Sequence, residues 1–452
     1  MYFYAVVSLL VLLRCLFFLY FVISQGHYMA IDSPVYLTLS ENLLQHHVFS
    51  MSSSEPFPPD VFRTPGYPFF LALIQGLGMH SFYWTVFWQE LIYLACIALF
   101  FVQGRPLFGE KIVRIGVIFL LLEPGGLSYP KQLLSETLFL PFVFCSLLAM
   151  GAYMHKARWQ PLILSACAAG LGAWVRPAII YLPLVMTVCV LVFTYKEKRV
   201  WLQQGVFLLV FMVMISPWLL RNYNQFGQVI ISGQTSNMLA GYHVPITWES
   251  AKNEPFEEGF AEVKRLVDQA VEQKSKKLGR PLNQVERYQL QQKFALNELL
   301  KYPADYALEW LFGILKTMNG GNATEVYRTL NLRVDRLHYF AIQETNFVKK
   351  VGIFLLHQDF LFVLMVFLRV LIGIFALLGV VPIYKSKNAF LWLMLLTNFY
   401  FICLPGPMGY ARFRFPVEVF WFIQAFYGLT FFTEWLQKRK PATELVQEAV
   451  EN

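Results

Sequence analysis

The chain has 452 residues, of which 57% are hydrophobic, 17% aromatic and only 15% charged, and its mean hydropathy is +0.48. This composition excludes a soluble protein of several domains, and the continuous apolar runs exclude a β-barrel, whose strands alternate apolar and polar residues. Much of the net charge of +8 comes from basic residues beside apolar runs, where they set membrane topology. We therefore expect the lipid bilayer, and no nucleic acid, as a partner.

Apolar segments long enough to span a membrane recur along the chain. We place them at residues 2–24, 82–102, 112–128, 132–153, 160–175, 177–195, 201–219, 359–384, 389–404 and 416–436. The stretch 67–79 is too short to cross and is expected to form a dipping or interfacial helix. The sequence predicts an all-α polytopic membrane protein: a bundle of about ten transmembrane helices with outer-face juxtamembrane helices and a mainly helical extracytoplasmic segment.

Basic residues in the short loops predict the orientation. They cluster at 105–114, 156–158, 196–199, 385–387 and 438–440, and with ten spans all of these clusters fall on one face, which is therefore cytoplasmic. Both termini then lie in the cytoplasm. We expect four parts: an N-terminal transmembrane catalytic module (1–221) with a first outer loop (25–68), an extracytoplasmic segment (222–352), C-terminal transmembrane helices (353–437) and a cytoplasmic tail (438–452).

The first outer loop contains a candidate active site. Ser33 followed by Pro34 predicts the start of a short helix that runs to about His47. Asp32 lies just before this helix, and Tyr36 lies on its first turn. A Ser/Pro-rich loop follows, and Arg63 then comes just before the apolar sequence resumes. A carboxylate, a helix N-terminus and an arginine are thus predicted to meet at one membrane face.

Arginines also gather at the ends of spans on the predicted outer face, where the positive-inside rule should deplete them. They are Arg63, Arg176, Arg221, Arg412 and Arg414. For any one of them the alternative is snorkelling to the interface, or an ion pair with a nearby acidic group. Together they favour a phosphate site, because the planar guanidinium binds two phosphate oxygens at once.

Ionisable residues inside or at the ends of the spans are expensive and are therefore candidates for function or for pairing. We expect Arg14, Glu90 and Arg369, near mid-membrane, to pair with other helices. Glu123, Glu136 and Glu418 lie near the outer ends of their spans, level with the arginines, and Glu136 is the strongest functional candidate. The six cysteines all fall in apolar segments without metal or disulfide spacing, so no metal site is expected among them.

Four motifs in order resemble one known family. They are Asp32 and Tyr36 with Arg63–Pro68 (RTPGYP), Ser135–Phe139 (SETLF), Ser216–Asn222 (SPWLLRN) and Ala411–Pro416 (ARFRFP). The pattern resembles the GT-C glycosyltransferases, in the family 39-like branch that includes protein O-mannosyltransferases and aminoarabinose transferases of lipid A. The resemblance runs from residue 1 to about 430 and is weak between 235 and 350.

This resemblance implies a membrane glycosyltransferase that takes its sugar from a polyprenyl phosphate. The acceptor would be a glycan, lipid or protein hydroxyl on the extracytoplasmic face, and the membrane a bacterial inner membrane with the site facing the periplasm or exterior. It requires no cofactor. Many relatives have two adjacent acidic residues in the first loop, whereas Ile31 and Ser33 flank Asp32 here. This difference weakens the case for a metal ion at Asp32, although binding of a divalent cation stays an open alternative.

The residues suit this chemistry on their own. A lipid phosphate leaves as an anion and needs no general acid, so one carboxylate can take the proton of the acceptor and arginines can stabilise the phosphate. We assign catalysis to Asp32, as the base of an inverting transfer, with Glu136 as the second carboxylate. Donor phosphate or substrate binding is assigned to Tyr36, Arg63, Tyr67, Arg176, Arg221, Arg412 and Arg414.

Two other functional classes stay open at this point. A lipid-linked sugar flippase or other secondary transporter would also need intramembrane charges, although transporters usually show internal repeats, and none is seen here. A structural or assembly protein would leave the outer arginines unexplained. Asp32 itself has an alternative role as a helix cap only, in which case the base would be Glu136.

Overall fold

The structure is a computed structural model that describes residues 2–26, 28–329, 352, 356 and 360–438, so nearly all of the expected tail (438–452) lies outside the described residues. Every regular element in this part is helical. The first half contains α1 (Tyr2–Ile23), α2 (Ser33–Gln45), α3 (Gly66–Gly76), α4 (Phe82–Phe108), α5 (Glu110–Leu122), α6 (Pro124–Ser128), η1 (Tyr129–Lys131), α7 (Glu136–Lys156), α8 (Trp159–Val175), η2 (Pro177–Ile179), α9 (Leu182–Thr194) and α10 (Lys198–Phe226).

The second half begins with shorter and more polar helices. They are α11 (Gln234–Met238), the π-helix η3 (Leu239–His243), α12 (Val244–Lys252), α13 (Phe256–Leu278), α14 (Gln284–Leu299), α15 (Pro303–Asn319) and α16 (Ala323–Thr329). Apolar helices follow: α18 (Phe360–Ser386), α19 (Ala389–Cys403), η5 (Gly406–Met408), η6 (Ala411–Val417) and α20 (Glu418–Gln437).

Each expected apolar segment coincides with one or more helices over its described residues. Seven described helices are long and apolar enough to cross a membrane: Tyr2–Ile23, Phe82–Phe108, Glu136–Lys156, Pro177–Thr194, Lys198–Phe226, Phe360–Ser386 and Ala411–Gln437. Glu110–Leu122 and Pro124–Lys131 form a pair bent by 51° that counts as an eighth. Trp159–Val175 and Ala389–Cys403 are apolar but shorter. The prediction of an all-α, multi-pass membrane protein is confirmed, and a total of ten spans holds only if the two shorter helices also cross.

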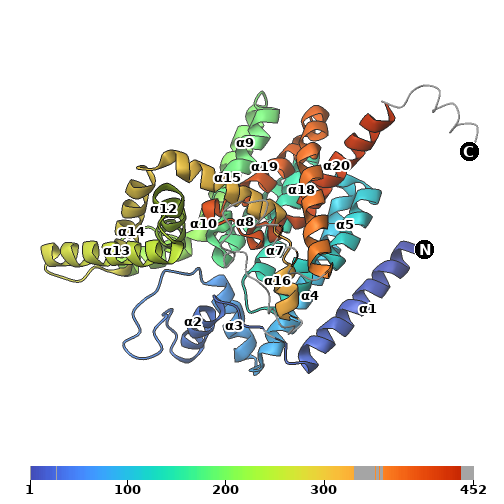
Figure 1. Cartoon of the computed structure of the whole chain (residues 1–452). Helices are drawn as coiled ribbons and strands as arrows, with labels where there is room; N and C mark the ends of the chain where they lie inside the picture. Colours follow the sequence, from blue (N-terminus) through green and yellow to red (C-terminus); the bar gives the residue numbers. More distant parts are fainter. Residues whose placement is uncertain (1, 27, 330–351, 353–355, 357–359, 439–452) are drawn as a thin grey trace, which may run out of the picture.

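The helices pack into one main bundle with a large apolar core that runs through α4, α5, α7–α10, α19 and α20. Figure 1 shows α1 along one side of this bundle and α13 and α14 projecting on the opposite side, with α2 and α3 at one end. Close packing of α18 on α20 depends on Gly379 and Gly428, since a side chain at either would overlap the backbone of the other helix.

The mid-membrane charges pair as predicted. Arg14 of α1 bonds Glu90 of α4 at 2.6 Å, and Lys131 bonds the other oxygen of Glu90 at 3.0 Å. Arg369 of α18 pairs with Glu418 at the start of α20. Breaking a buried pair leaves an uncompensated charge, so these contacts fix how α1 and α18 dock on the bundle.

Candidate functional site

Asp32 lies at the start of α2, at the end of the bundle. The expected helix is present, with Pro34 in its first turn, and it begins at Ser33, one residue earlier than the sequence indicates. The Ser33 hydroxyl donates to the carbonyl of Leu133 at 2.9 Å and so ties the start of α2 to the segment before α7. The Asp32 side chain makes no capping hydrogen bond. The alternative in which Asp32 is only a helix cap therefore lacks the bond that defines a cap.

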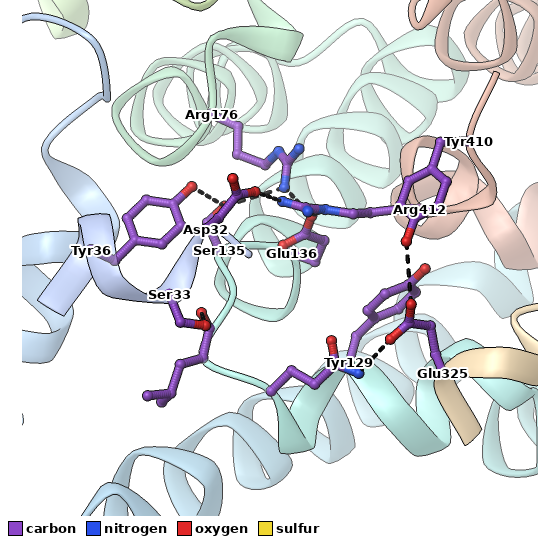
Figure 2. A network of polar contacts seen from close by, with 12 residues as sticks. Asp32, Ser33, Tyr36, Tyr129, Ser135, Glu136, Arg176, Glu325, Tyr410 and Arg412 are labelled. Carbon is purple, nitrogen blue, oxygen red and sulfur yellow. Dashed lines mark hydrogen bonds and ion pairs between the residues drawn. The ribbon is translucent and has the colours of Figure 1, made fainter. Parts of the chain in front are cut away.

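Two arginines that are far apart in the chain hold the Asp32 carboxylate. Arg63 donates to Oδ1 at 2.6 Å and Arg412 donates to Oδ2 at 2.7 Å. Figure 2 shows the second contact, with Arg412 extending from η6, which directly precedes α20. The Arg63 guanidinium also lies over the Tyr36 ring, 5.0 Å from its centre, which is within the range of a cation–π contact.

Glu136, the first residue of α7, shares the same arginine. Its carboxylate is 1% exposed and pairs with both Arg412 and Arg176. Arg412 therefore bridges the two carboxylates (Figure 2). Arg176 also donates to the Ser135 hydroxyl at 3.2 Å. The five charged groups of Asp32, Arg63, Glu136, Arg176 and Arg412 are called the charged cluster. They come from the first loop, the start of α7, the end of α8 and η6.

Tyr36 and Tyr67 pack beside the charged cluster. The Tyr36 hydroxyl lies 3.1 Å from the Ser135 hydroxyl, and the Tyr36 and Tyr67 rings meet edge to face with their centres 4.8 Å apart. Tyr67 is fully buried, and its hydroxyl donates to Gln89 at 2.7 Å. Tyr36 thus borders the cluster directly, whereas Tyr67 acts through Tyr36.

Three arginines and two carboxylates leave the charged cluster with one excess positive charge. Burial alone would raise the pKa of Asp32, but the guanidinium groups of Arg412 and Arg63 outweigh it and lower that pKa to about 2. Two buried polar atoms of the cluster, Arg63 Nε and Glu136 Oε2, have no hydrogen-bond partner among the described residues. Such atoms are rare in folded proteins and are available to a ligand.

A small cavity adjoins these groups. It is lined by Glu136, Arg176 and Arg412 together with Phe139, Ala178, Phe401, Phe413 and Pro416, and its volume of about 10 Å³ matches roughly one water molecule. The two arginines that line this cavity, Arg176 and Arg412, are both paired with carboxylates of the charged cluster.

Arg414 is not part of the charged cluster. It is fully buried and donates to Glu418 at 2.8 Å, to the carbonyls of Met318 and Gly320 at 2.7 and 2.8 Å, and to that of Thr317. The last three carbonyls lie at the C-terminal end of α15, where a cation is favourable. Arg414 thus holds α15 against α20, two residues from Arg412.

Arg221 also lies apart from the cluster. It donates to the carbonyl of Asp60 at 2.7 Å and to that of Phe49 at 3.4 Å, so it fastens the first loop to the end of α10. Gln284 of α14 donates to the Asp60 carboxylate at 2.6 Å. These contacts fix the stretch that leads into Arg63, and Arg221 can act on the cluster only through this stretch.

The other acidic candidates have structural partners. Glu123 accepts the backbone N–H groups of Gly125 and Gly126 at 2.8 and 2.5 Å and so caps α6, and Glu418 holds Arg369 and Arg414. Within the described ranges, no three His, Cys, Asp or Glu side chains lie close enough to hold a metal ion.

Comparison with known proteins bears on the same region. Residues 62–220 match the family model described as dolichyl-phosphate-mannose-protein mannosyltransferase. The predicted family resemblance is confirmed for this segment, which is less than half of the chain. Arg63, Glu136 and Arg176 lie inside the matched segment, whereas Asp32 and Arg412 lie outside it.

Two solved structures are also similar over most of the chain. ArnT from Cupriavidus metallidurans bound to undecaprenyl phosphate is 15% identical, with a TM-score of 0.43 over 92% of this chain and 77% of that one. The apo state of the same protein is 14% identical, with a TM-score of 0.41 over 93% and 77%. Both likenesses are too remote to carry an assignment. No curated protein matches the chain.

Proposed function

We propose that this protein transfers a sugar from a polyprenyl-phosphate donor to an acceptor hydroxyl on the extracytoplasmic face of the membrane, with inversion at the anomeric carbon. The observation that carries the proposal is the Asp32 carboxylate held between Arg63 and Arg412, with Arg412 shared by Glu136. The family match over residues 62–220 supports the same class of reaction.

The charge of the cluster suits such a donor. A polyprenyl-phosphate sugar is a phosphodiester with one negative charge, which would neutralise the one excess positive charge of the three arginines and two carboxylates. When the bond between the anomeric carbon and the phosphate oxygen breaks, the phosphate gains a second negative charge. Arginines already in place can stabilise this charge as it develops.

The same contacts control the base. While Arg63 and Arg412 hold Asp32, its pKa of about 2 makes it a weak base. Arginines that turn to the donor phosphate release the carboxylate, and its pKa then rises towards the ordinary range. Asp32 would take the proton of the acceptor hydroxyl as the hydroxyl oxygen attacks the anomeric carbon. In this scheme the base is activated only when a donor is bound.

The direct test incubates purified protein with a polyprenyl-phosphate sugar and a mixture of envelope acceptors. Release of polyprenyl phosphate together with a glycosylated product is the expected result. The competing transporter hypothesis predicts movement of intact donor across the membrane of a proteoliposome without release of polyprenyl phosphate, and that outcome would overturn the proposal.

A further inference from the structure

A second polar cluster lies beside the charged cluster and joins three distant parts of the chain (Figure 2). Its centre is Glu325 of α16, which is 7% exposed. Glu325 Oε1 accepts a hydrogen bond from the Tyr410 hydroxyl at 3.2 Å, and Oε2 accepts one from the Gln132 side-chain amide at 2.8 Å. Arg328, on the next turn of α16, pairs with the same carboxylate at 3.1 Å.

Both partners of Glu325 lie next to residues of the charged cluster. Tyr410 is two residues before Arg412, and Gln132 is four residues before Glu136. Arg412 and Glu136 are the two ends of one ion pair. Glu325 therefore contacts both stretches of chain that carry this pair, although it touches neither charged group.

The position of Gln132 has a further consequence. Its backbone carbonyl accepts from the Gln89 amide at 2.7 Å, and Gln89 in turn accepts the Tyr67 hydroxyl. Tyr67 packs against Tyr36, whose ring contacts Arg63 of the charged cluster. The segment before Glu136 is thus held from both sides, by Glu325 and by the buried glutamine of α4.

A second contact fixes α16 itself. The Tyr129 hydroxyl donates to Asn322 at 2.9 Å, and the Tyr129 ring meets the Phe415 ring edge to face with centres 4.8 Å apart. Partial burial and the neighbouring Glu325 carboxylate raise the pKa of Tyr410 to about 12, so its hydroxyl remains a donor throughout the physiological range.

We propose that Glu325 is a positioning residue that holds Arg412 and Glu136 in register for the donor phosphate, through Tyr410 and Gln132. The inference rests on the proposed function, since it assigns Glu325 to the same reaction. It also gives α16, in the segment between α10 and α18, a role in the reaction. A misplacement of about 1 Å at a reacting centre can lower a rate roughly a hundredfold.

The side-chain chemistry distinguishes positioning from a direct catalytic role. Glu325→Gln keeps the shape and can keep both hydrogen bonds, because the Tyr410 hydroxyl can accept as well as donate. Glu325→Ala removes both. If Glu325 positions its neighbours, Glu325→Gln should keep most of the activity that Glu325→Ala loses. If Glu325 acts as a charge or a base, both variants should lose activity to the same extent.

The experiment measures two quantities on full-length protein: binding of undecaprenyl phosphate by native mass spectrometry, and transfer kinetics with a polyprenyl-phosphate sugar. Glu325→Ala should lower kcat at least about tenfold and weaken lipid-phosphate binding, since it displaces the residues that hold the phosphate. Its KM for the acceptor should stay near the wild-type value. Glu325→Gln should stay within a few-fold of wild type in both assays. Tyr410→Phe, which removes one hydroxyl, should cost roughly three- to tenfold.

Glu298→Ala is the matched control. Glu298 also pairs with a cation three residues further along the chain, Lys301 at 2.6 Å, but lies at the end of α14. It should behave as wild type. Tyr410→Phe combined with Glu325→Ala should be no worse than Glu325→Ala alone, because both act through one contact.

The proposal would be overturned if the losses of activity from Tyr410→Phe and Glu325→Ala were additive in the double variant, or if Glu325→Gln and Glu325→Ala lost activity equally. So would wild-type behaviour of Glu325→Ala, or a change confined to the KM for the acceptor. If the wild type shows no turnover, the proposed function fails, and the binding arm alone decides the role of Glu325.

Discussion

Arg412 and Arg414 lie two residues apart, and replacing each by lysine should have opposite consequences. Arg412 uses Nε and a terminal nitrogen to reach two different carboxylates, Glu136 and Asp32. Lysine carries one compact charge and cannot present this fork. A donor phosphate that takes over these contacts would lose one charge-assisted hydrogen bond in Arg412→Lys, which is about 1.5–3 kcal/mol, or roughly a ten- to hundredfold weaker affinity.

Arg414→Lys should instead damage stability. Arg414 is fully buried and satisfies Glu418 and three carbonyls at the end of α15. Lysine has three donors for four acceptors and a different shape, so at least one buried acceptor is left unpaired. An unpaired buried acceptor costs about 1–3 kcal/mol of stability, and α15 should loosen from α20.

The assay compares both variants in the same detergent. Undecaprenyl phosphate binding by native mass spectrometry gives the affinity, and thermal unfolding gives the stability. Arg412→Lys should bind weakly with a nearly unchanged Tm, and Arg414→Lys should unfold at a lower temperature while its folded fraction binds normally. Weak binding with an unchanged Tm for Arg414→Lys would refute the assignment of its side chain to structure, and normal binding by Arg412→Lys would remove Arg412 from the donor site.

Three further predictions concern Arg63, the pKa of Asp32 and the orientation of the chain in the membrane. Arg63→Ala should weaken donor binding roughly ten- to a hundredfold, with partial rescue by lysine; unchanged donor affinity in a titration would make it a packing residue. The carboxyl of Asp32 is ionised above its pKa, which is about 2 rather than 3.8, so its ion pairs should persist as the pH falls through 3.8 and be lost only near 2. In a pH–rate profile, the acid limb of kcat/KM reports the pKa of Asp32 in the free enzyme and should lie near 2. The acid limb of kcat reports the same pKa in the donor complex and should lie at higher pH, because the bound donor releases the carboxylate. Acid limbs at the same pH would contradict that release. Membrane-impermeant labelling should reach a cysteine at Ser53 or Lys276 and not one at Lys198, and the reverse pattern would overturn the predicted orientation.

The local part of the site could be predicted from the sequence because it depends on short-range patterns. Asp32, the start of α2 and Arg63 all belong to one loop, and the Ser-Pro pair marks the helix start within one residue. That Arg14 and Glu90 each pair with another helix also follows from the expense of burying either charge alone, although the sequence does not say that they pair with each other. A single charged residue within an apolar segment predicts a buried partner or a function, and this prediction requires no knowledge of the fold.

The long-range part could not be predicted. Arg412 reaches Asp32 across 380 positions of sequence, and only packing of the bundle brings them together. Arg412 and Arg414 look equivalent in the sequence, but η6 has about three residues per turn. Residues two apart then point in clearly different directions, so one meets the charged cluster and the other meets α15.

The partners of Arg221, and the position of Glu325, could not be predicted for a different reason. Arg221 donates to two backbone carbonyls of the first loop. Every residue has a backbone carbonyl, so the sequence does not show which carbonyls an arginine will contact. Glu325 pairs with a phenol and an amide, neither of which is unusual in a polar segment. The one available signal was the position of Tyr410 and Gln132 just before two motifs that already pointed to function.

The most direct test of the central claim is the rate of sugar transfer by Asp32→Asn. Asparagine starts a helix nearly as well as aspartate but cannot accept the proton. The account predicts a fall of at least about a hundredfold in transfer, with expression near the wild-type level and undecaprenyl phosphate binding that is not weakened, because Arg63 and Arg412 remain. Product formed by Asp32→Asn at close to the normal rate would contradict the account and would move the base to Glu136.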